Sequence, residues 1–377
     1  MPVALSASDL TRQRLPDCVY ETGRHTSTSA IHKDKFYTGS LAAWKNFEHE
    51  VRQNFQSANL HTCSLPMIYD DTGLDKDTNL HLEHFRCGEE ISISGRFVQN
   101  ALHVVSAVAK AKKFDLVFGD WKASDTSNGI KPMDEVYLAG LDENDEAVQH
   151  QKSIAKKVLA SLVPDYCIID NNDKARVVGE AKVPWVHEFD GWWKSFEDGD
   201  DEDIRQALGQ IAYYMQKANL KYGFLTNYNF TFFLKQESLG ETARLYCSQP
   251  IGHEAIGSEL SVSVRQCLLH LMMEAKGQNM KGWHSLNESK TWALKQGRKE
   301  KRNVFLKRVK EALKNERKLA SDTDGVTGLL TKLENMTLRE EERRTRSSTE
   351  ERSQSTASTR TTRSGRTVRI ANDGEDA

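Results

Sequence analysis

The segment from residue 164 to residue 183 constrains the fold more than any other part of the chain. Two runs of strand-forming residues, 165–170 and 176–183, flank Asn-Asn-Asp-Lys, which has the composition of a turn. This order predicts a β-hairpin. With a four-residue turn, Asp170 would face Ala175, and the same count places Asp165 opposite Glu180. The sequence therefore predicts two carboxylates that meet across two paired strands.

Two carboxylates in these positions imply a cation. Cross-strand partners have Cβ atoms roughly 4.5 to 5.5 Å apart, and like charges at that distance repel unless a cation or a proton lies between them. Because strand side chains alternate, Lys182 shares a face with Glu180, whereas Gly179 and Ala181 point into a packed layer. Oxygen ligands suit Mg²⁺, with Mn²⁺ as the alternative, and such an ion can assist phosphoryl chemistry. The competing interpretation is a surface hairpin with a Glu–Lys ion pair, which contributes little to stability.

Hydrophobic periodicity elsewhere in the chain predicts a mixed α/β fold. Apolar residues at spacings of three and four predict helices over 41–55, 89–112, 154–162, 204–219 and 259–276. Runs of strand-forming residues predict further strands over 114–121, 136–141, 222–227 and 231–236. The first forty residues show no sustained periodicity, and we expect little function there.

Charge divides the chain. The formal net charge of −2 conceals an excess of Lys and Arg in the last quarter. A basic helical pattern runs from Asn287 to about Leu319, and beyond Glu340 the chain becomes rich in Ser, Thr and Arg, which predicts disorder. We predict four parts. Residues 1–84 form a lead-in with a bracing helix, 85–277 a core, 278–336 a basic helical extension and 337–377 a disordered tail.

The chain shows no basic stretch followed by a long apolar run near its start, and no apolar run of the roughly 20 residues that a membrane helix needs. We therefore expect an intracellular protein, and the basic stretch favours the nucleus over the cytoplasm. Six cysteines without a CxxC pair are typical of buried thiols in a reducing compartment. The spacing of a further group of His and Cys residues fits no standard zinc finger; they are His61, Cys63, His81, His84 and Cys87.

The central motif resembles that of a known superfamily. Pro164 and Asp165, followed by Glu180 and Lys182 on the next predicted strand, resemble the signature of the PD-(D/E)xK, or restriction-endonuclease-like, nucleases. On the predicted helix that follows, the spacing of Gln210 and Tyr214 is similar to the QxxxY element of recombination-type exonucleases within that superfamily. The wider runs 178–185, 210–215 and 223–227 resemble a fungal branch of these proteins. The resemblance extends over roughly residues 85 to 275.

The resemblance implies a restriction-endonuclease-like core, in which helices flank a mixed central sheet. It also implies a Mg²⁺-dependent nuclease that hydrolyses phosphodiester bonds. Asp165 and Glu180 would bind the metal ion, and Lys182 would assist catalysis. Glu90, or its neighbour Glu89, would match the helix-borne acid that some members add to the metal site. Gln210 would orient the metal site or a phosphate group.

Nucleic acid is the expected partner, with DNA favoured over RNA. The candidate contact residues lie on the helix after the motif and in the basic extension; they are Gln206, Tyr214, Lys299, Arg302, Lys307 and Arg308. Competing interpretations place Gln206 and Gln210 on an ordinary exposed helix face, Tyr214 in the core, and the basic residues on a solvated helix. A catalytically inactive nucleic-acid-binding or protein-interaction module on the same fold is the alternative function. Strong metal-independent binding without turnover would identify such a module.

Overall fold

The computed structural model describes residues 4–20, 35–66, 86–124, 163–239, 242–276, 292–294, 301, 303–315 and 318. The chain divides into two units, Met1–Glu316 and Arg317–Ala377, and every helix and strand named below belongs to the first unit. The strand predicted over 136–141, the helix predicted over 154–162 and the tail predicted over 337–377 lie outside the described residues.

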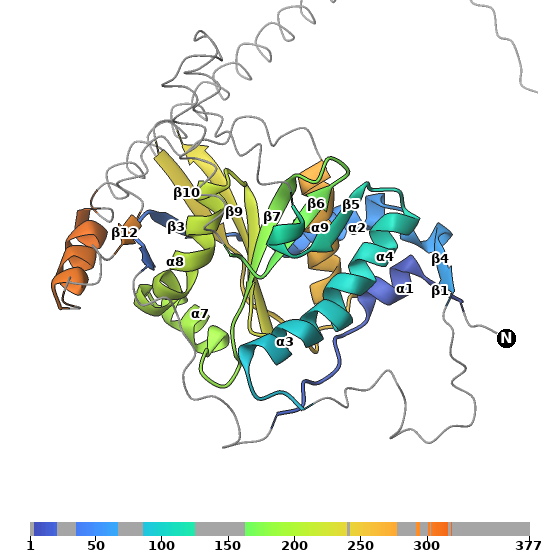
Figure 1. Cartoon of the computed structure of the whole chain (residues 1–377), viewed down its shortest axis with the longest axis horizontal. Helices are drawn as coiled ribbons and strands as arrows, with labels where there is room; N and C mark the ends of the chain where they lie inside the picture. Colours follow the sequence, from blue (N-terminus) through green and yellow to red (C-terminus); the bar gives the residue numbers. More distant parts are fainter. Residues whose placement is uncertain are drawn as a thin grey trace, which may run out of the picture. The chain divides into compact units, whose positions relative to one another are not determined.

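A mixed eight-stranded sheet forms the centre of the first unit (Figure 1). Its strands follow one another across the sheet in the order β3 (Ser40–Ala43), β10 (Thr242–Cys247), β9 (Phe230–Leu239), β8 (Tyr222–Thr226), β7 (Ala175–Ala181), β6 (Tyr166–Asp170) and β5 (Leu116–Gly119), and β11 (Ile251–Gly252) pairs with β9. The β3–β10 and β7–β8 pairs are parallel, and the other neighbours are antiparallel. The fold is mixed α/β, as predicted.

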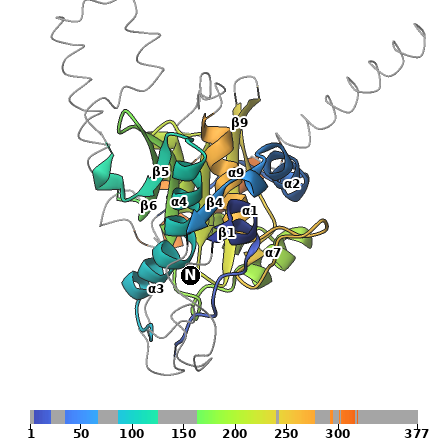
Figure 2. The same ribbon diagram turned by 90° about the vertical axis from the view of Figure 1, so that its right-hand side faces the viewer.

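Helices cover both faces of this sheet (Figures 1 and 2). One face carries α7 (Phe189–Glu197) and α8 (Glu202–Lys217), and the other carries α1 (Ala7–Arg12), α2 (Phe47–Ser57), α4 (His103–Ala111) and α9 (Val264–Lys276). Helix α3 (Glu90–Phe97) continues through a π-helical turn, Val98–Leu102, into α4, which confirms the helix predicted over 89–112. Strand β7 is buried on both sides, because Val177 packs with the α2–α4–α9 layer and Val178 with the α7–α8 layer.

Smaller elements complete the first unit. Strand β1 (Ala4–Ser6) pairs with β4 (Ser64–Pro66), and β2 (Lys35–Tyr37) pairs with β12 (Trp292–Leu294), both antiparallel. Short 3-10 turns lie at Leu60–Thr62 and Trp121–Ala123. The part of the chain before residue 85 thus adds β3 to the central sheet and α2 to one of its faces.

Three predicted helices differ from the observed elements. The helix predicted over 41–55 begins at Phe47, because the residues before it pair with β10 as strand β3. The helix predicted over 259–276 begins at Val264, because the hydroxyl of Ser258 accepts the N–H of Ser261 in a preceding turn. The basic helix predicted from Asn287 is interrupted by strand β12, and among its described residues 303–315 are helical.

Helix α7 was not predicted, although Phe189, Trp193 and Phe196 recur at helical spacing. The segment is short and runs directly into acidic residues, so its periodicity covers little more than two turns. No helix in the described part of the chain is long and apolar enough to cross a membrane.

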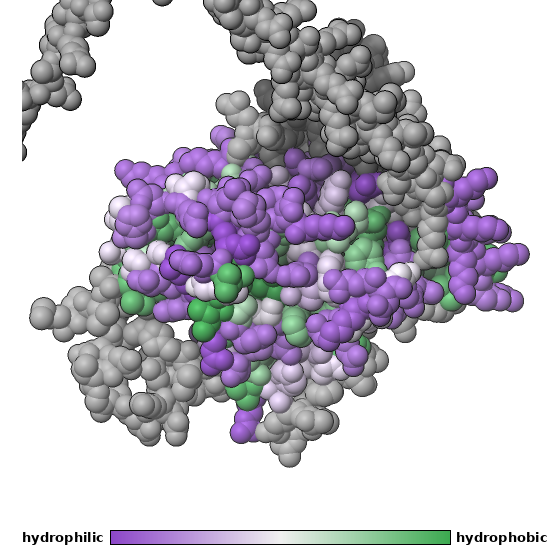
Figure 3. Space-filling model, turned by 180° about the vertical axis from the view of Figure 1, so that it is seen from behind, coloured by the Kyte–Doolittle hydropathy of each residue, from purple (hydrophilic) through white to green (hydrophobic). Residues whose placement is uncertain are grey.

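Most of the described surface is hydrophilic on the face seen from behind, with apolar patches that are small and scattered (Figure 3). None of the six cysteines, all of which are described, forms a disulfide, and the sulfur atoms of Cys18 and Cys87 lie 3.6 Å apart.

Candidate active site on strand β7

The β6–β7 hairpin brings the predicted carboxylates together. Tyr166 pairs with Gly179, and continuing that register by one residue places Asp165 opposite Glu180, as predicted. The two strands are antiparallel neighbours within the sheet, so both carboxylates lie on the side that α8 covers, together with Val178. The register therefore places the two carboxylates opposite each other, as the metal hypothesis requires.

The same hairpin departs from the predicted register near its turn. A shift between Ile168 and Ile169 makes Ile169, rather than Asp170, the partner of Ala175. Asp170 instead accepts hydrogen bonds through Oδ1 from the N–H groups of Asn172 and Lys174, so the turn winds around its side chain. The predicted pairing of Asp170 with Ala175 is therefore wrong, because a β-bulge absorbs one residue.

Glu180 is the most deeply buried acid of the site, with 3% of its surface exposed. Its Oε1 accepts a hydrogen bond from Lys182 Nζ at 2.8 Å, whereas its Oε2 is buried and has no hydrogen-bond partner among the described residues. Burial raises the pKa of Glu180 to about 8, and the charge of Lys182 opposes that rise. A buried carboxylate oxygen without a partner destabilises the ionised form, so this atom would gain from a cation.

Asp165 lies just before β6 and is tied to the opposite strand. Its Oδ2 accepts the N–H of Ala181 at 2.7 Å. Burial raises the pKa of Asp165, while that hydrogen bond and the charge of Lys182 act to lower it. Because the charge of Asp165 also raises the pKa of Glu180, the two carboxylates are close enough to repel each other.

Lys182 is 4% exposed and stands among three acids. Besides its bond to Glu180, its Nζ lies 4.0 Å from Oε1 of Glu90, the first residue of α3. Burial acts to lower the pKa of Lys182, but the charges of Glu180, Glu90 and Asp165 together raise it, so the ammonium form persists. Glu90, whose side chain is 41% exposed, borders the site on the solvent side.

This geometry bears on the competing interpretation of the hairpin as a surface element with a Glu–Lys ion pair. The Glu180–Lys182 ion pair does exist, but it is buried rather than on the surface. A buried ion pair is a poor source of stability, because taking both charges out of water costs several kcal/mol per ion, of the order of the attraction that it gains. A role in fold stability alone therefore accounts poorly for these residues.

Helix α8 adds an amide and a phenol. Gln210 and Tyr214 are both buried, and Gln210 Nε2 donates to the Tyr214 hydroxyl at 3.0 Å. Within the described part of the chain, Oε1 of Gln210 is buried without a partner. Burial and then the charge of Glu180 raise the pKa of Tyr214 to about 12. The exposed-face interpretation is wrong for Gln210, whereas Gln206 is only partly buried and Tyr214 lies in the apolar α7–α8 layer.

Lys35 on β2 lies close to these residues, a position that the sequence did not indicate. Its Nζ lies 4.3 Å from the ring centre of Tyr213 and 5.0 Å from that of Tyr214. Burial lowers the pKa of Lys35, and the charge of Glu180 opposes that shift. The expectation of little function in the first forty residues stays a prediction. The sequence did not indicate the position of Lys35, because one lysine in an aperiodic segment carries no signal of its own.

A close backbone approach holds β2 against α8. A Cβ atom at Gly209, within α8, would lie 2.6 Å from the carbonyl oxygen of Lys35. Arg205, one turn earlier, donates through Nη1 to the carbonyl oxygens of Tyr37 and Gly39 at 3.3 and 2.6 Å. The absence of a side chain at Gly209 therefore lets β2 carry Lys35 to the tyrosine pair.

Replacing Gly209 by Ala is expected to lower the free energy of unfolding by about 1 to 3 kcal/mol. Alanine favours a helix by about 1 kcal/mol over glycine, but here the new methyl group meets backbone atoms that cannot rotate away. Gly95→Ala in α3 is the matched control, because a Cβ there meets no described atom within 4 Å. Urea denaturation of both variants measures the effect, and equal stabilisation by both would contradict the close approach.

The oxygen donors of the site are compatible with Mg²⁺. No group of three or more His, Cys, Asp and Glu side chains that could hold a metal ion is found among the described residues. Mg²⁺, however, keeps several waters and is usually bound by one or two carboxylates together with substrate phosphates. The unpaired Oε2 of Glu180, with Asp165 across the hairpin and Glu90 nearby, fits that requirement.

The predicted contacts in the basic extension are placed in part. Lys307 and Arg308 lie on the helix over 303–315, and Lys299 and Arg302 lie outside the described residues. The comparisons with known proteins assign no family, since no protein-family profile, curated protein or solved structure matches the chain.

Proposed function

We propose that this protein is a Mg²⁺-dependent nuclease with a restriction-endonuclease-like core, which hydrolyses phosphodiester bonds in nucleic acid, DNA being favoured over RNA. One observation carries the proposal: Glu180 has a buried oxygen without a hydrogen-bond partner among the described residues. Its carboxyl group accepts a bond from Lys182 and lies across the hairpin from Asp165. Burying such groups costs several kcal/mol, which a scaffold has no physical reason to incur. The basic extension favours a nuclear location for the same activity.

Asp165 and Glu180 would hold the ion, and Glu90 would complete the site from the solvent side. When bound, Mg²⁺ would polarise a phosphoryl oxygen and lower the pKa of a water molecule. Lys182 keeps its proton among the three acids, so it can donate hydrogen bonds to a phosphate oxygen or to the attacking water. Its bond to Glu180 fixes the direction of that donation.

Residues of α8 and β2 would position the substrate. Tyr214 holds the amide of Gln210 in one orientation, which leaves Gln210 Oε1 to accept a hydrogen bond from a water molecule in the site. Lys35, packed over Tyr213 and Tyr214, would supply a second positive charge toward the phosphate. Mn²⁺ should replace Mg²⁺, because both are hard ions that prefer oxygen ligands.

An inactive nucleic-acid-binding module is the second candidate. The observation that favours it is the hydrogen bond from Lys182 to Glu180, which already satisfies one oxygen of this carboxyl group without a metal ion. Such a module would bind nucleic acid equally well with Mg²⁺ and with EDTA, and it would release the substrate intact.

Incubation with end-labelled single-stranded and double-stranded DNA and RNA, in Mg²⁺, Mn²⁺ or EDTA, tests the proposed function. We expect cleavage of at least one substrate with either ion and none with EDTA. The favoured substrate identifies the nucleic acid. The product lengths distinguish exonuclease activity, which begins at a strand end, from endonuclease activity within the strand. Intact substrates in every condition, together with binding that ignores the metal, would instead support the inactive module.

Mg²⁺ affinity is expected to rise with pH up to about 8, the raised pKa of Glu180. Below that pH the metal-free carboxyl group holds a proton, which the ion must displace, so each unit of lower pH weakens binding about tenfold. Above it the affinity should level off. Calorimetry in buffers of different ionisation enthalpy counts the released proton, and Glu180→Gln should bind weakly at every pH. Binding that releases no proton at about pH 7 would contradict this role of Glu180.

A further inference from the structure

The helix over 303–315 is amphipathic and is anchored by its apolar side. Phe305, Val309 and Leu313, each four residues apart, are buried in one cluster with Phe36 of β2. A spacing of four residues places side chains along one side of a helix, so this cluster fixes which side of the helix faces the protein. The remaining side faces solvent, and it carries the charge.

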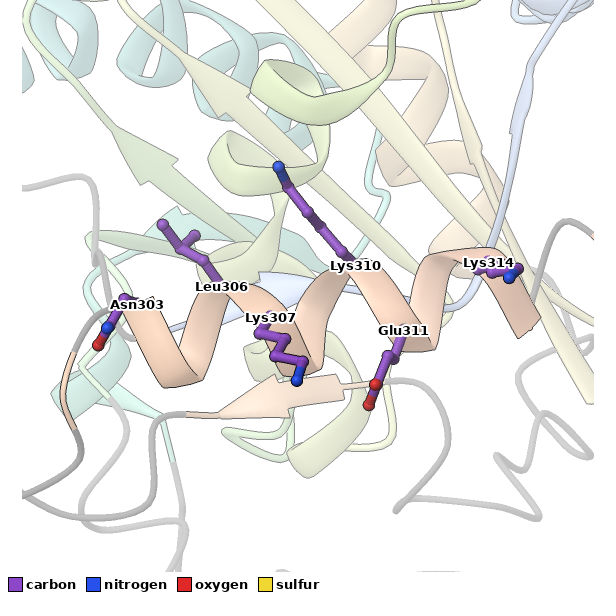
Figure 4. Close-up of a pocket in the computed structure, with 6 residues that line it drawn as sticks. All are labelled: Asn303, Leu306, Lys307, Lys310, Glu311 and Lys314. Carbon is purple, nitrogen blue, oxygen red and sulfur yellow. The ribbon is translucent and has the colours of Figure 1, made fainter.

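Three exposed lysines gather on that outward side, which we name the lysine face and define as Lys307, Lys310 and Lys314. Together with Asn303, Leu306 and Glu311 they line a shallow depression, open to solvent, along one side of this helix (Figure 4). One carboxylate, that of Glu311, thus stands among three ammonium groups. In Figure 3 this helix lies at the right-hand edge of the described part, where the surface is mostly hydrophilic.

Strand β2 links the lysine face to the candidate active site. Neighbouring strand residues point to opposite sides, so Phe36 anchors the helix while Lys35 turns toward Tyr213 and Tyr214 of α8. The charge of Glu180 acts on Lys35. The lysine face is therefore held in a fixed relation to the carboxylates through a single three-residue strand, which itself is clamped to α8 at Gly209.

We propose that the lysine face binds the phosphate backbone of a nucleic-acid strand, DNA being favoured, outside the point of cleavage. This inference rests on the proposed function and adds a binding surface to it. The positions from Lys307 to Lys314 span about 10 Å of helix, and one strand of B-form DNA carries a charge about every 3.4 Å, so the face matches roughly three phosphates. Lysine binds phosphate as a flexible point charge, so this contact is independent of base sequence.

Anisotropy of a labelled strand of about 30 nucleotides tests the surface with the full chain in EDTA, at several salt concentrations. We expect Lys307→Glu, Lys310→Glu and Lys314→Glu, combined, to weaken binding at least about tenfold. The number of counterions released on binding, given by the slope of log affinity against log salt concentration, should fall by about two to three. The corresponding triple Ala variant should also bind more weakly than the wild type, but with a smaller loss of affinity than the triple Glu variant. The control combines Lys110→Glu, Lys122→Glu and Lys174→Glu, three exposed lysines on other elements, and it should bind like the wild type.

The outcomes separate this surface from the proposed function, because binding in EDTA needs no cleavage. Weaker binding by the lysine-face variant alone supports the surface, even if the wild type cleaves nothing in Mg²⁺. Equal binding by the two triple variants overturns the surface, even if cleavage in Mg²⁺ is robust. Binding of the wild-type chain to vesicles of anionic lipid, without any binding to nucleic acid, would also overturn the proposed surface.

Discussion

Replacing Glu180 by Gln should reduce metal-dependent cleavage by a factor on the order of 10³, the largest effect that we expect from a single substitution. Glutamine keeps the shape of the side chain and an oxygen for Lys182 Nζ, but it removes the charge that would hold the ion. Single-turnover cleavage of the favoured substrate measures the loss. Raising the Mg²⁺ concentration should recover little of the rate, because an amide oxygen is a weak ligand without charge.

Glu237→Gln on β9 is the matched control for this variant. Glu237 is a strand residue that forms an ion pair with Lys235 at 3.0 Å, as Glu180 does with Lys182, but it lies on β9, two strands across the sheet from β7. We expect its variant to retain the wild-type rate. If Glu180→Gln cleaves as fast as Glu237→Gln while both remain folded, Glu180 is no metal ligand.

Replacing Lys182 by Met should lower the cleavage rate by about 10² to 10³. The substitution removes the hydrogen bond to Glu180 and the positive charge that keeps the pKa of Glu180 from rising further. The residual activity should therefore reach its maximum at a higher pH than wild-type activity, because more alkaline conditions are needed to ionise Glu180. A pH–rate profile at a fixed Mg²⁺ concentration well below saturation measures both effects, because the ion then competes with the proton of Glu180.

Lys194→Met serves as the control, because Lys194 is exposed on α7 and pairs with Asp190 at 2.5 Å. Its rate and pH profile should match those of the wild type. An unchanged pH optimum in Lys182→Met, accompanied by a large loss of rate, would mean that Lys182 acts on the substrate without influencing Glu180. An unchanged rate would remove Lys182 from the site.

The sequence predicted those parts of the site that are encoded locally. The hairpin was predictable because turn-forming residues separate two apolar runs, and its register toward Asp165 and Glu180 follows from counting residues. The placement of Gln210 and Tyr214 came from resemblance to a known motif, and the structure shows that the two side chains are hydrogen-bonded to each other. The roles of Asp165, Glu180 and Gln210 in catalysis, and of Tyr214 as a nucleic-acid contact, stay predictions.

Other parts were not predictable, because they depend on contacts between segments far apart in the chain. Lys35 reaches the site through packing of β2 against Gly209, which lies more than 170 residues away in the sequence. Leu41 carries a helical spacing with Trp44, yet pairing with β10 makes it part of a strand. The bulge at Ile169 shifts the register by one residue without any distinctive composition. Local patterns hold no information on such contacts.

The burial of the carboxylates was likewise beyond the sequence. The alternation of β7 predicts that Glu180 and Lys182 share a face, but it does not reveal that α8 covers this face and leaves Glu180 3% exposed. That burial raises the pKa of Glu180 and separates a candidate metal site from an ordinary surface ion pair.

The most direct test of the account is cleavage of labelled DNA in Mg²⁺ and in EDTA by the wild type, Asp165→Ala and Lys182→Ala, with DNA binding measured in parallel. Asp165→Ala removes the carboxylate opposite Glu180 across the hairpin, and Lys182→Ala removes the group that donates a hydrogen bond to Glu180. The account predicts Mg²⁺-dependent cleavage by the wild type, its loss in both variants, and retained binding in all three. Cleavage that persists in EDTA or in both variants would contradict it.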